Sequence, residues 1–266
     1  MGQVIVVNNP VNIAWTPAEL GADLALWLDA DDASTITLNG SNVSQWNDKS
    51  GQNTHAVQAI SANQPSYSAT SFLGKPGLTF DGSDDTLFIT TSLMQNNTTH
   101  GVYWVMERVG AGSGDLYRPD IGVLHPTNAD RGALHYIKTN NQGASYPYYQ
   151  GPFLNNYDNV NVGYASGVGY IKAFQSNVTG WGGWRNGTLE ETTNGIASPD
   201  NTNIVYSLAR QFNVNRASNI RMSEVIAVSN ATTTNRQLIE GYLAWKWGLV
   251  ANLPADHPYK NSAPTL

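Results

Sequence analysis

The chain has 266 residues, of which 41% are hydrophobic and 13% are charged, against a charged fraction of about 25% in an average soluble protein. A disordered chain shows the opposite balance, so we expect a folded core. The formal net charge is −6, and the 14 Lys and Arg residues are scattered, which excludes the clustered positive charge that nucleic-acid binding requires. Cysteine is absent, and this excludes disulfides, thiolate metal sites and cysteine nucleophiles.

Residues 1–14 are a short apolar run followed by asparagines. They predict either an edge strand or an arm that anchors the chain to a neighbouring subunit. The apolar run is too short for a signal peptide. No stretch has the roughly 20 consecutive apolar residues of a membrane span, so we expect neither an export signal nor membrane insertion.

From residue 15 onward, short apolar segments alternate with turn signals. The segment 23–30 is apolar on both faces, which predicts a strand buried on both sides. Further strands are expected at 102–106, 133–138, 170–174, 203–208 and 222–229. Asn-Gly pairs at 39–40 and 186–187 predict tight hairpins because they accept positive φ at both central positions. Residues 15–266 therefore predict one all-β domain, a two-sheet antiparallel jelly-roll sandwich.

The segment 232–249 breaks this pattern. Its apolar residues recur at helical spacing, and they are Leu238, Tyr242, Trp245 and Leu249, joined by Ile239 and Leu243 one position over. Thr232 is placed as the N-cap and Gly248 as the C-terminal stop. The segment predicts a single amphipathic helix that packs on the sandwich, followed by a proline-rich tail.

Four motifs carry a family resemblance, at residues 27–30, 46–51, 80–82 and 239–259. In this order they resemble the concanavalin A-like (laminin G-like) jelly-roll domains of bacteriophage structural proteins and of some secreted bacterial proteins. The resemblance covers residues 15–264. It implies two curved, stacked antiparallel sheets, often with a concave face or rim loops that hold glycans. It also implies architectural motif residues, with Asp48 accepting hydrogen bonds from its own turn and Tyr242, Trp245 and Trp247 giving bulk to bury.

Catalytic patterns are missing from the sequence. Retaining glycoside hydrolases need two carboxyl groups about 5–5.5 Å apart, but Glu190 and Glu191 are adjacent and point to opposite faces of a strand. Glu107 and Glu224 each stand alone in their strands. No nucleophile elbow or phosphate-binding loop is present, and the five histidines lack zinc-ligand spacing. We therefore expect no catalytic residues and a protein that is not an enzyme.

Two acidic groups are candidate calcium ligands, because calcium prefers hard oxygen donors. One comprises Asp29, Asp31 and Asp32, and the other Asp81, Asp84 and Asp85. The alternative is that these are ordinary solvated turn residues. No other cofactor is expected.

Aromatic residues beside prolines and glycines form the candidate ligand-binding set, which comprises Tyr146, Tyr148, Tyr149, Trp181 and Trp184. Flat aromatic faces stack on the apolar C–H faces of sugars, and neighbouring amides bind sugar hydroxyls. The same composition suits a protein–protein contact. Trp184 alternatively packs above the hairpin at 186–187.

These observations favour a non-enzymatic structural protein of a tailed-phage virion, either a capsid decoration or head-fibre subunit or a tail-fibre or receptor-binding subunit. Its expected location is the virion surface, and its expected partners are other virion proteins and cell-surface glycans, with a homotrimer as a possible assembly. The alternative is a free carbohydrate-binding module of a secreted bacterial protein. A glycoside hydrolase is the third hypothesis.

Overall fold

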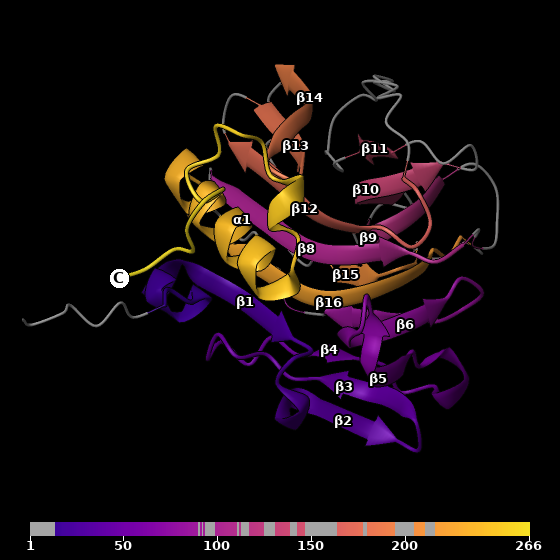
Figure 1. Ribbon diagram of the computed structural model, residues 1–266. Coiled ribbons are helices and arrows are strands. Elements are labelled where there is room, and N and C mark those ends of the chain that lie inside the picture. Colours follow the sequence, from indigo (N-terminus) through magenta and orange to yellow (C-terminus); the bar gives the residue numbers. More distant parts are fainter. Residues whose placement is uncertain are drawn as a thin grey trace, which may run out of the picture.

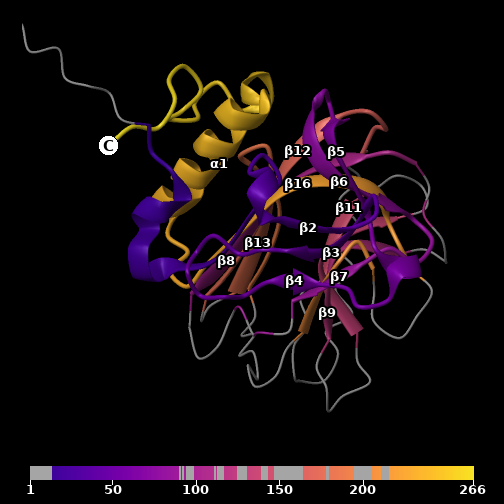
Figure 2. The ribbon, with the colours of Figure 1, turned by 90° about the horizontal axis from the view of Figure 1, so that it is seen from below.

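The computed structural model describes residues 14–89, 91, 93, 99–110, 112, 117–124, 131–138, 143–146, 164–177, 180–194, 205–210 and 216–266. Strongly curved antiparallel β-structure forms most of the molecule, and one helix near the C-terminus lies across its outside (Figure 1, and Figure 2 from below). The predicted all-β sandwich with a single C-terminal helix is confirmed. No helix in these ranges combines the length and apolarity needed to cross a membrane.

The strands follow one another with short connections in the N-terminal half. They are β1 (Leu24–Asp29), β2 (Ile36–Asn39), β3 (Asn42–Trp46), β4 (Ala56–Val57), β5 (Ser66–Phe72), β6 (Lys75–Asp81), β7 (Leu87–Ile89), β8 (His100–Arg108), β9 (Tyr117–Leu124), β10 (Arg131–Lys138), β11 (Gly143–Tyr146), β12 (Gly169–Asn177), β13 (Gly180–Arg185), β14 (Thr188–Asn194), β15 (Val205–Leu208) and β16 (Asn219–Val228). Short 3-10 helices lie at Pro17–Asp23, Ala33–Thr35, Ser61–Asn63 and Val250–Asn252.

The strand ladders are all antiparallel, and the hydrogen-bonded order is β11-β10-β9-β15-β7-β4-β3-β5-β6-β16-β8-β12-β13-β14. β1 pairs with β16, and β2 pairs with β3. Most of these strands contribute side chains to one buried cluster. In it, Trp46 of β3, Phe80 of β6, Trp104 of β8 and Tyr206 of β15 are fully or almost fully buried. The ladder therefore folds back on itself and encloses the main core between its two halves.

Strand β8 shows why some segments are apolar on both faces. Val102, Trp104 and Met106 enter the core between the two halves of the ladder. The intervening residues, Tyr103 and Val105, enter a second core beneath the helix. A strand covered on both sides reads as a continuous apolar run. The same holds for β1, as predicted.

Helix α1 spans Thr233–Trp247. Thr232 is its N-cap, since the Thr232 hydroxyl accepts the backbone N–H of Asn235, and Gly248 ends it in the left-handed conformation. The predicted helix and caps are confirmed. Of the predicted apolar positions, Ile239, Leu243 and Leu249 are buried, whereas Trp245 is not. The buried positions of α1 are Arg236, Ile239, Glu240, Gly241, Leu243, Ala244 and Trp247. Trp245, predicted as buried bulk, is 41% exposed.

Both predicted hairpins are present, but only one has Asn-Gly as its central pair. Asn186 and Gly187 have φ of 52° and 80° between β13 and β14. Between β2 and β3, Asn39 is still paired in the strand with Asn42, and of the two loop residues only Gly40 has a positive φ, of 68°. Positive φ at both central residues of the β13–β14 turn matches the twist of a two-residue hairpin.

The described chain begins and ends side by side. Ala14 forms an antiparallel bridge with Thr265, and the backbone N–H of Trp15 donates to the Pro264 carbonyl at 3.1 Å. The predicted arm or edge strand at residues 1–14 lies outside the described residues, except for Ala14.

Candidate functional site

Two of the sequence motifs, at residues 27–30 and 239–259, meet at one carboxylate, that of Glu224 in β16, whose side chain is fully buried. The indole N–H groups of Trp27 and Trp247 donate to it at 2.7 and 2.6 Å, and the Tyr242 hydroxyl donates at 3.0 Å. The Lys246 Nζ lies 2.9 Å from Glu224 Oε2. Burial raises the pKa of Glu224, and the Lys246 ammonium opposes this effect. A buried carboxylate with this many donors is compensated rather than free to act on a substrate.

A second carboxylate, Asp29 of β1, adjoins the first. The Lys246 Nζ lies 2.6 Å from Asp29 Oδ1, and the Lys49 Nζ lies 2.9 Å from Oδ2. Lys49 also lies 3.0 Å from Asp32. Two ammonium groups therefore neutralise Asp29, and Asp31 approaches it only by donating its backbone N–H at 3.1 Å. In the acid group predicted here as a calcium site, lysines therefore contact Asp29 and Asp32, and calcium at this group stays a prediction.

Asp48 connects the second motif to the first. It accepts the backbone N–H groups of Trp27, Ser50 and Thr54 at 2.9, 2.8 and 3.0 Å, and the Ser50 hydroxyl at 2.6 Å. The implied role of Asp48 in holding its own turn is present in the structure, and the Trp27 contact extends it to β1. The motifs at 27–30, 46–51 and 239–259 are therefore parts of one polar network.

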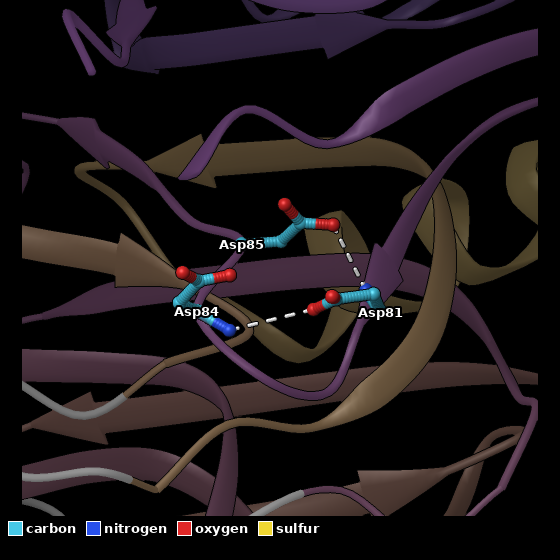
Figure 3. Close-up of side chains that lie close together, drawn as sticks. All are labelled: Asp81, Asp84 and Asp85. Atoms are coloured by element: carbon cyan, nitrogen blue, oxygen red, sulfur yellow. Dashed lines mark hydrogen bonds between the residues drawn. The ribbon is translucent and has the colours of Figure 1, made fainter. Parts of the chain in front are cut away.

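The other acid group does converge. Asp81 ends β6, and Asp84 and Asp85 lie in the turn that leads to β7, with one carboxylate oxygen of each within 4.8 Å of the others (Figure 3). Asp85 Oδ2 accepts the backbone N–H of Asp81 at 3.0 Å, and Asp81 Oδ1 accepts that of Ser83 at 2.7 Å. Burial, together with the charges of Asp81 and Asp84, raises the pKa of Asp85 to about 6. Calcium at this turn stays a prediction.

Sequence reasoning missed a buried charged cluster on the strands β12–β14. Lys172, 2% exposed, contacts the Tyr164 hydroxyl and lies 2.7 Å from Glu190 Oε2. Arg185 Nε lies 2.7 Å from Glu190 Oε1, and its guanidinium lies over the rings of Tyr164 and Tyr170 at 5.1 and 5.6 Å. Burial and the neighbouring Glu190 raise the pKa of Tyr164 well above its usual range. The sequence carries one signal for this cluster. Lys172 alternates with Tyr170 and Phe174, so it lies on the face of an apolar strand that points into the core.

The predicted aromatic ligand set is only partly described. Trp184 packs against the core beneath α1, with the guanidinium of Arg236 4.6 Å from its ring. A Cβ on Gly182 would lie 2.5 Å from Trp184, so the indole covers that glycine. Trp184 therefore packs beneath α1, whereas the predicted alternative placed it above the hairpin at 186–187. Its part in ligand binding stays a prediction. The side chains of Tyr146 and Trp181 lie outside the described part, as do Tyr148 and Tyr149 entirely.

Trp245 is an exposed aromatic residue that the sequence placed in the core. Its indole N–H donates to the Tyr259 carbonyl at 2.9 Å, which fixes the ring on the outer surface of α1. A flat and oriented aromatic face of this kind is a second surface suited to stacking.

No protein-family model and no curated protein matches the chain. Solved structures match at the level of fold. Trypanosoma rangeli sialidase, in complex with a difluoro-KDN ligand, is 15% identical with a TM-score of 0.55 and matches over 80% of this chain and 31% of the sialidase. The chain therefore spans about a third of that enzyme's length.

Two further matches are to domains described as parts of larger proteins. Domain 4 of AbnA, a GH43 extracellular arabinanase from Geobacillus stearothermophilus, is in complex with arabinotriose. It is 9% identical, with a TM-score of 0.53 over 80% of this chain and 96% of that domain. The binding domain of Paraclostridial Mosquitocidal Protein 1 is 10% identical, with a TM-score of 0.52 over 83% of this chain and 51% of that one.

These likenesses establish the β-sandwich and correct one prediction. The expectation of a phage virion protein is contradicted, because the similar structures belong to carbohydrate-active enzymes and a toxin binding domain. The expected virion location and virion partners were consequences of that hypothesis and lose their basis with it. A homotrimer stays a prediction.

Proposed function

We propose that this protein is a carbohydrate-binding β-sandwich module that binds neutral oligosaccharides without cleaving them. The observation that carries this proposal is the match to AbnA domain 4, which is in complex with arabinotriose and is covered over 96% of its length. Correspondence over a whole domain supports a shared binding role better than a match to a third of a large enzyme does.

The chemistry of the chain supports binding over hydrolysis. Hydrolysis requires a pair of carboxyl groups that a sugar can reach. Among the described residues, Glu224 and Asp29 are enclosed by lysines and indoles. Glu190 is held by Lys172 and Arg185. A charged fraction of 13% and abundant Asn, Gln and Tyr suit the hydroxyls and apolar faces of neutral sugars.

We also propose which residues stack on the sugar and to which family the fold belongs. Tyr146, Tyr148, Tyr149 and Trp181 are the proposed stacking residues, while Trp184 is left out because it packs beneath α1. The concanavalin A-like family is supported by the meeting of the motifs around Glu224 and Asp48.

Glycan-array screening followed by calorimetry with arabinotriose tests the proposal. We expect saturable binding, reduced at least tenfold in a Tyr148→Ala, Tyr149→Ala variant and unchanged in the Trp245→Ala control, which removes an exposed tryptophan from α1. Loss of binding in the control alone would move the site to Trp245. Absence of binding to every glycan refutes the proposal, and release of reducing ends from any bound glycan favours a glycoside hydrolase instead.

A further inference from the structure

One amine and two carboxyl groups meet where β1, β16 and α1 come together. Lys246 Nζ lies 2.6 Å from Asp29 Oδ1 and 2.9 Å from Glu224 Oε2. The side chains are 17%, 5% and 0% exposed, respectively. Lys246 and Asp29 are 217 residues apart in sequence, so this contact joins the first strand to the last helix.

Aromatic rings enclose the contact. The Lys246 Nζ lies 5.1 Å from the Trp247 ring and 5.4 Å from the Tyr242 ring, and the indole of Trp27 donates to Glu224. An enclosure of this kind lowers the local dielectric and disfavours charged groups. Burial raises the pKa of Glu224 despite the opposing Lys246, which makes the Glu224 carboxylate a better proton acceptor beside the amine. The surroundings therefore favour proton transfer within the cluster.

We propose that Lys246 and Asp29 condense into an intramolecular isopeptide bond, with Glu224 as the proton-transfer residue. Transfer of a proton from the Lys246 ammonium to the Asp29 carboxylate gives a neutral amine and a carboxylic acid. The Nζ lone pair attacks Cγ of Asp29, while Glu224 takes a proton from Nζ and delivers it to the departing hydroxyl group. The N–C bond forms, the C–O bond breaks and one water leaves, with no change of oxidation state.

Proximity is what makes this condensation feasible. Near-attack separations of about 3–3.5 Å correspond to effective concentrations of roughly 10⁵–10⁸ M. The Lys246 and Asp29 side chains already lie in contact, and the reaction expels water from an enclosed site. Because the two groups come from β1 and α1, the bond forms only after the sandwich and helix have packed together.

Lys49 also contacts Asp29 and is the competing nucleophile. Its Nζ has Asp29 and Asp32 as neighbours rather than Glu224. Burial lowers the pKa of Lys49, but hydrogen bonds and charges from Asp29 and Asp32 outweigh this effect and raise it overall. The Lys49 side chain is 23% exposed and that of Asp32 is 38% exposed, so water reaches this pair. Lys246 has the fully buried Glu224 as its second carboxyl neighbour, and the reaction is therefore assigned to Lys246.

Mass spectrometry of the purified protein under denaturing conditions tests the proposal. We expect a mass one water below that of the sequence, together with a branched peptide pair joining Asp29 to Lys246. Lys246→Arg is the matched control, because it keeps the charge but cannot condense, and any trimming of the termini appears equally in both proteins. A wild-type mass equal to that of the sequence overturns the proposal, as does a bond from Asp29 to Lys49.

Two further variants test the chemistry. Asp29→Asn is expected to lose ammonia instead of water, giving a product of the same mass as the condensed wild type. Glu224→Gln keeps the size and one acceptor oxygen, and we expect its folded form, checked by circular dichroism, to keep the full uncondensed mass. Complete condensation in this variant overturns the role of Glu224. The wild-type mass remains decisive if the variant does not fold.

Discussion

Substituting Asp85 with asparagine tests the acidic turn between β6 and β7. The pKa of Asp85 is raised from 3.8 to about 6 in the folded protein, a difference of about two pH units that corresponds to ~3 kcal/mol. Asp81 is exposed and Asp84 is half-buried, so solvent screening reduces the usable effect to about 1–2 kcal/mol. Because the folded-state pKa is raised, this contribution to stability is fully present below about pH 4 and is lost as the pH rises through about 6.

Asp85→Asn removes the charge but keeps an oxygen that accepts the Asp81 backbone N–H. In chelator, we expect the variant to be more stable than the wild type at pH 8 by about 1–2 kcal/mol, with that advantage absent at pH 4. Urea unfolding at both pH values measures this difference. A variant that is less stable at pH 8, or an unchanged pH dependence, refutes the reasoning.

The same experiment repeated in calcium tests the predicted ion. Calcium is expected to raise the melting temperature of the wild type and to leave Asp85→Asn unchanged, because binding to the folded state alone stabilises it. Asp256→Asn is the control, since Asp256 is exposed and lies outside both acid groups. An unchanged wild-type midpoint counts against a calcium site.

Three further substitutions test the packing. Trp247→Phe removes a donor to buried Glu224 and should cost about 1.5–3 kcal/mol of unfolding free energy, whereas Trp245→Phe at the exposed position should cost less. Glu190→Gln breaks the buried pair with Lys172 and should cost about 3–5 kcal/mol of unfolding free energy. Adding Lys172→Met should restore most of this stability, and a double variant that is no more stable than Glu190→Gln contradicts this account. Gly182→Ala forces a methyl group against Trp184 and should cost about 1–3 kcal/mol. Chemical denaturation measures all three.

The fold was largely predictable from local signals. The strands around β8, β12 and β16, the β13–β14 turn and the caps of α1 follow from periodicity, Asn-Gly pairs and the Thr232 and Gly248 positions. These signals act over a few residues, so a single sequence is sufficient to read them.

The contacts that form the clusters were not predictable in the same way. The hydrophobicity of Trp245 predicts a place for it on the buried face of α1. The buried face instead includes two charged residues, Arg236 and Glu240, which pair at 2.8 Å. Pairing makes charge tolerable inside, and the partner is not visible in a hydropathy pattern. Glu224 looked isolated along β16 because its partners come from β1 and α1.

The bridge between Ala14 and Thr265 brings the chain back to its starting point. A short peptide joining these two positions would connect the segment 14–265 into a closed ring. New ends could then be opened at the β2–β3 turn, where Gly40 has no heavy atom within 4 Å of an added Cβ. Such a circular permutant should keep the sandwich, because the pairing between these two segments would be preserved when the order of the segments in the chain changes.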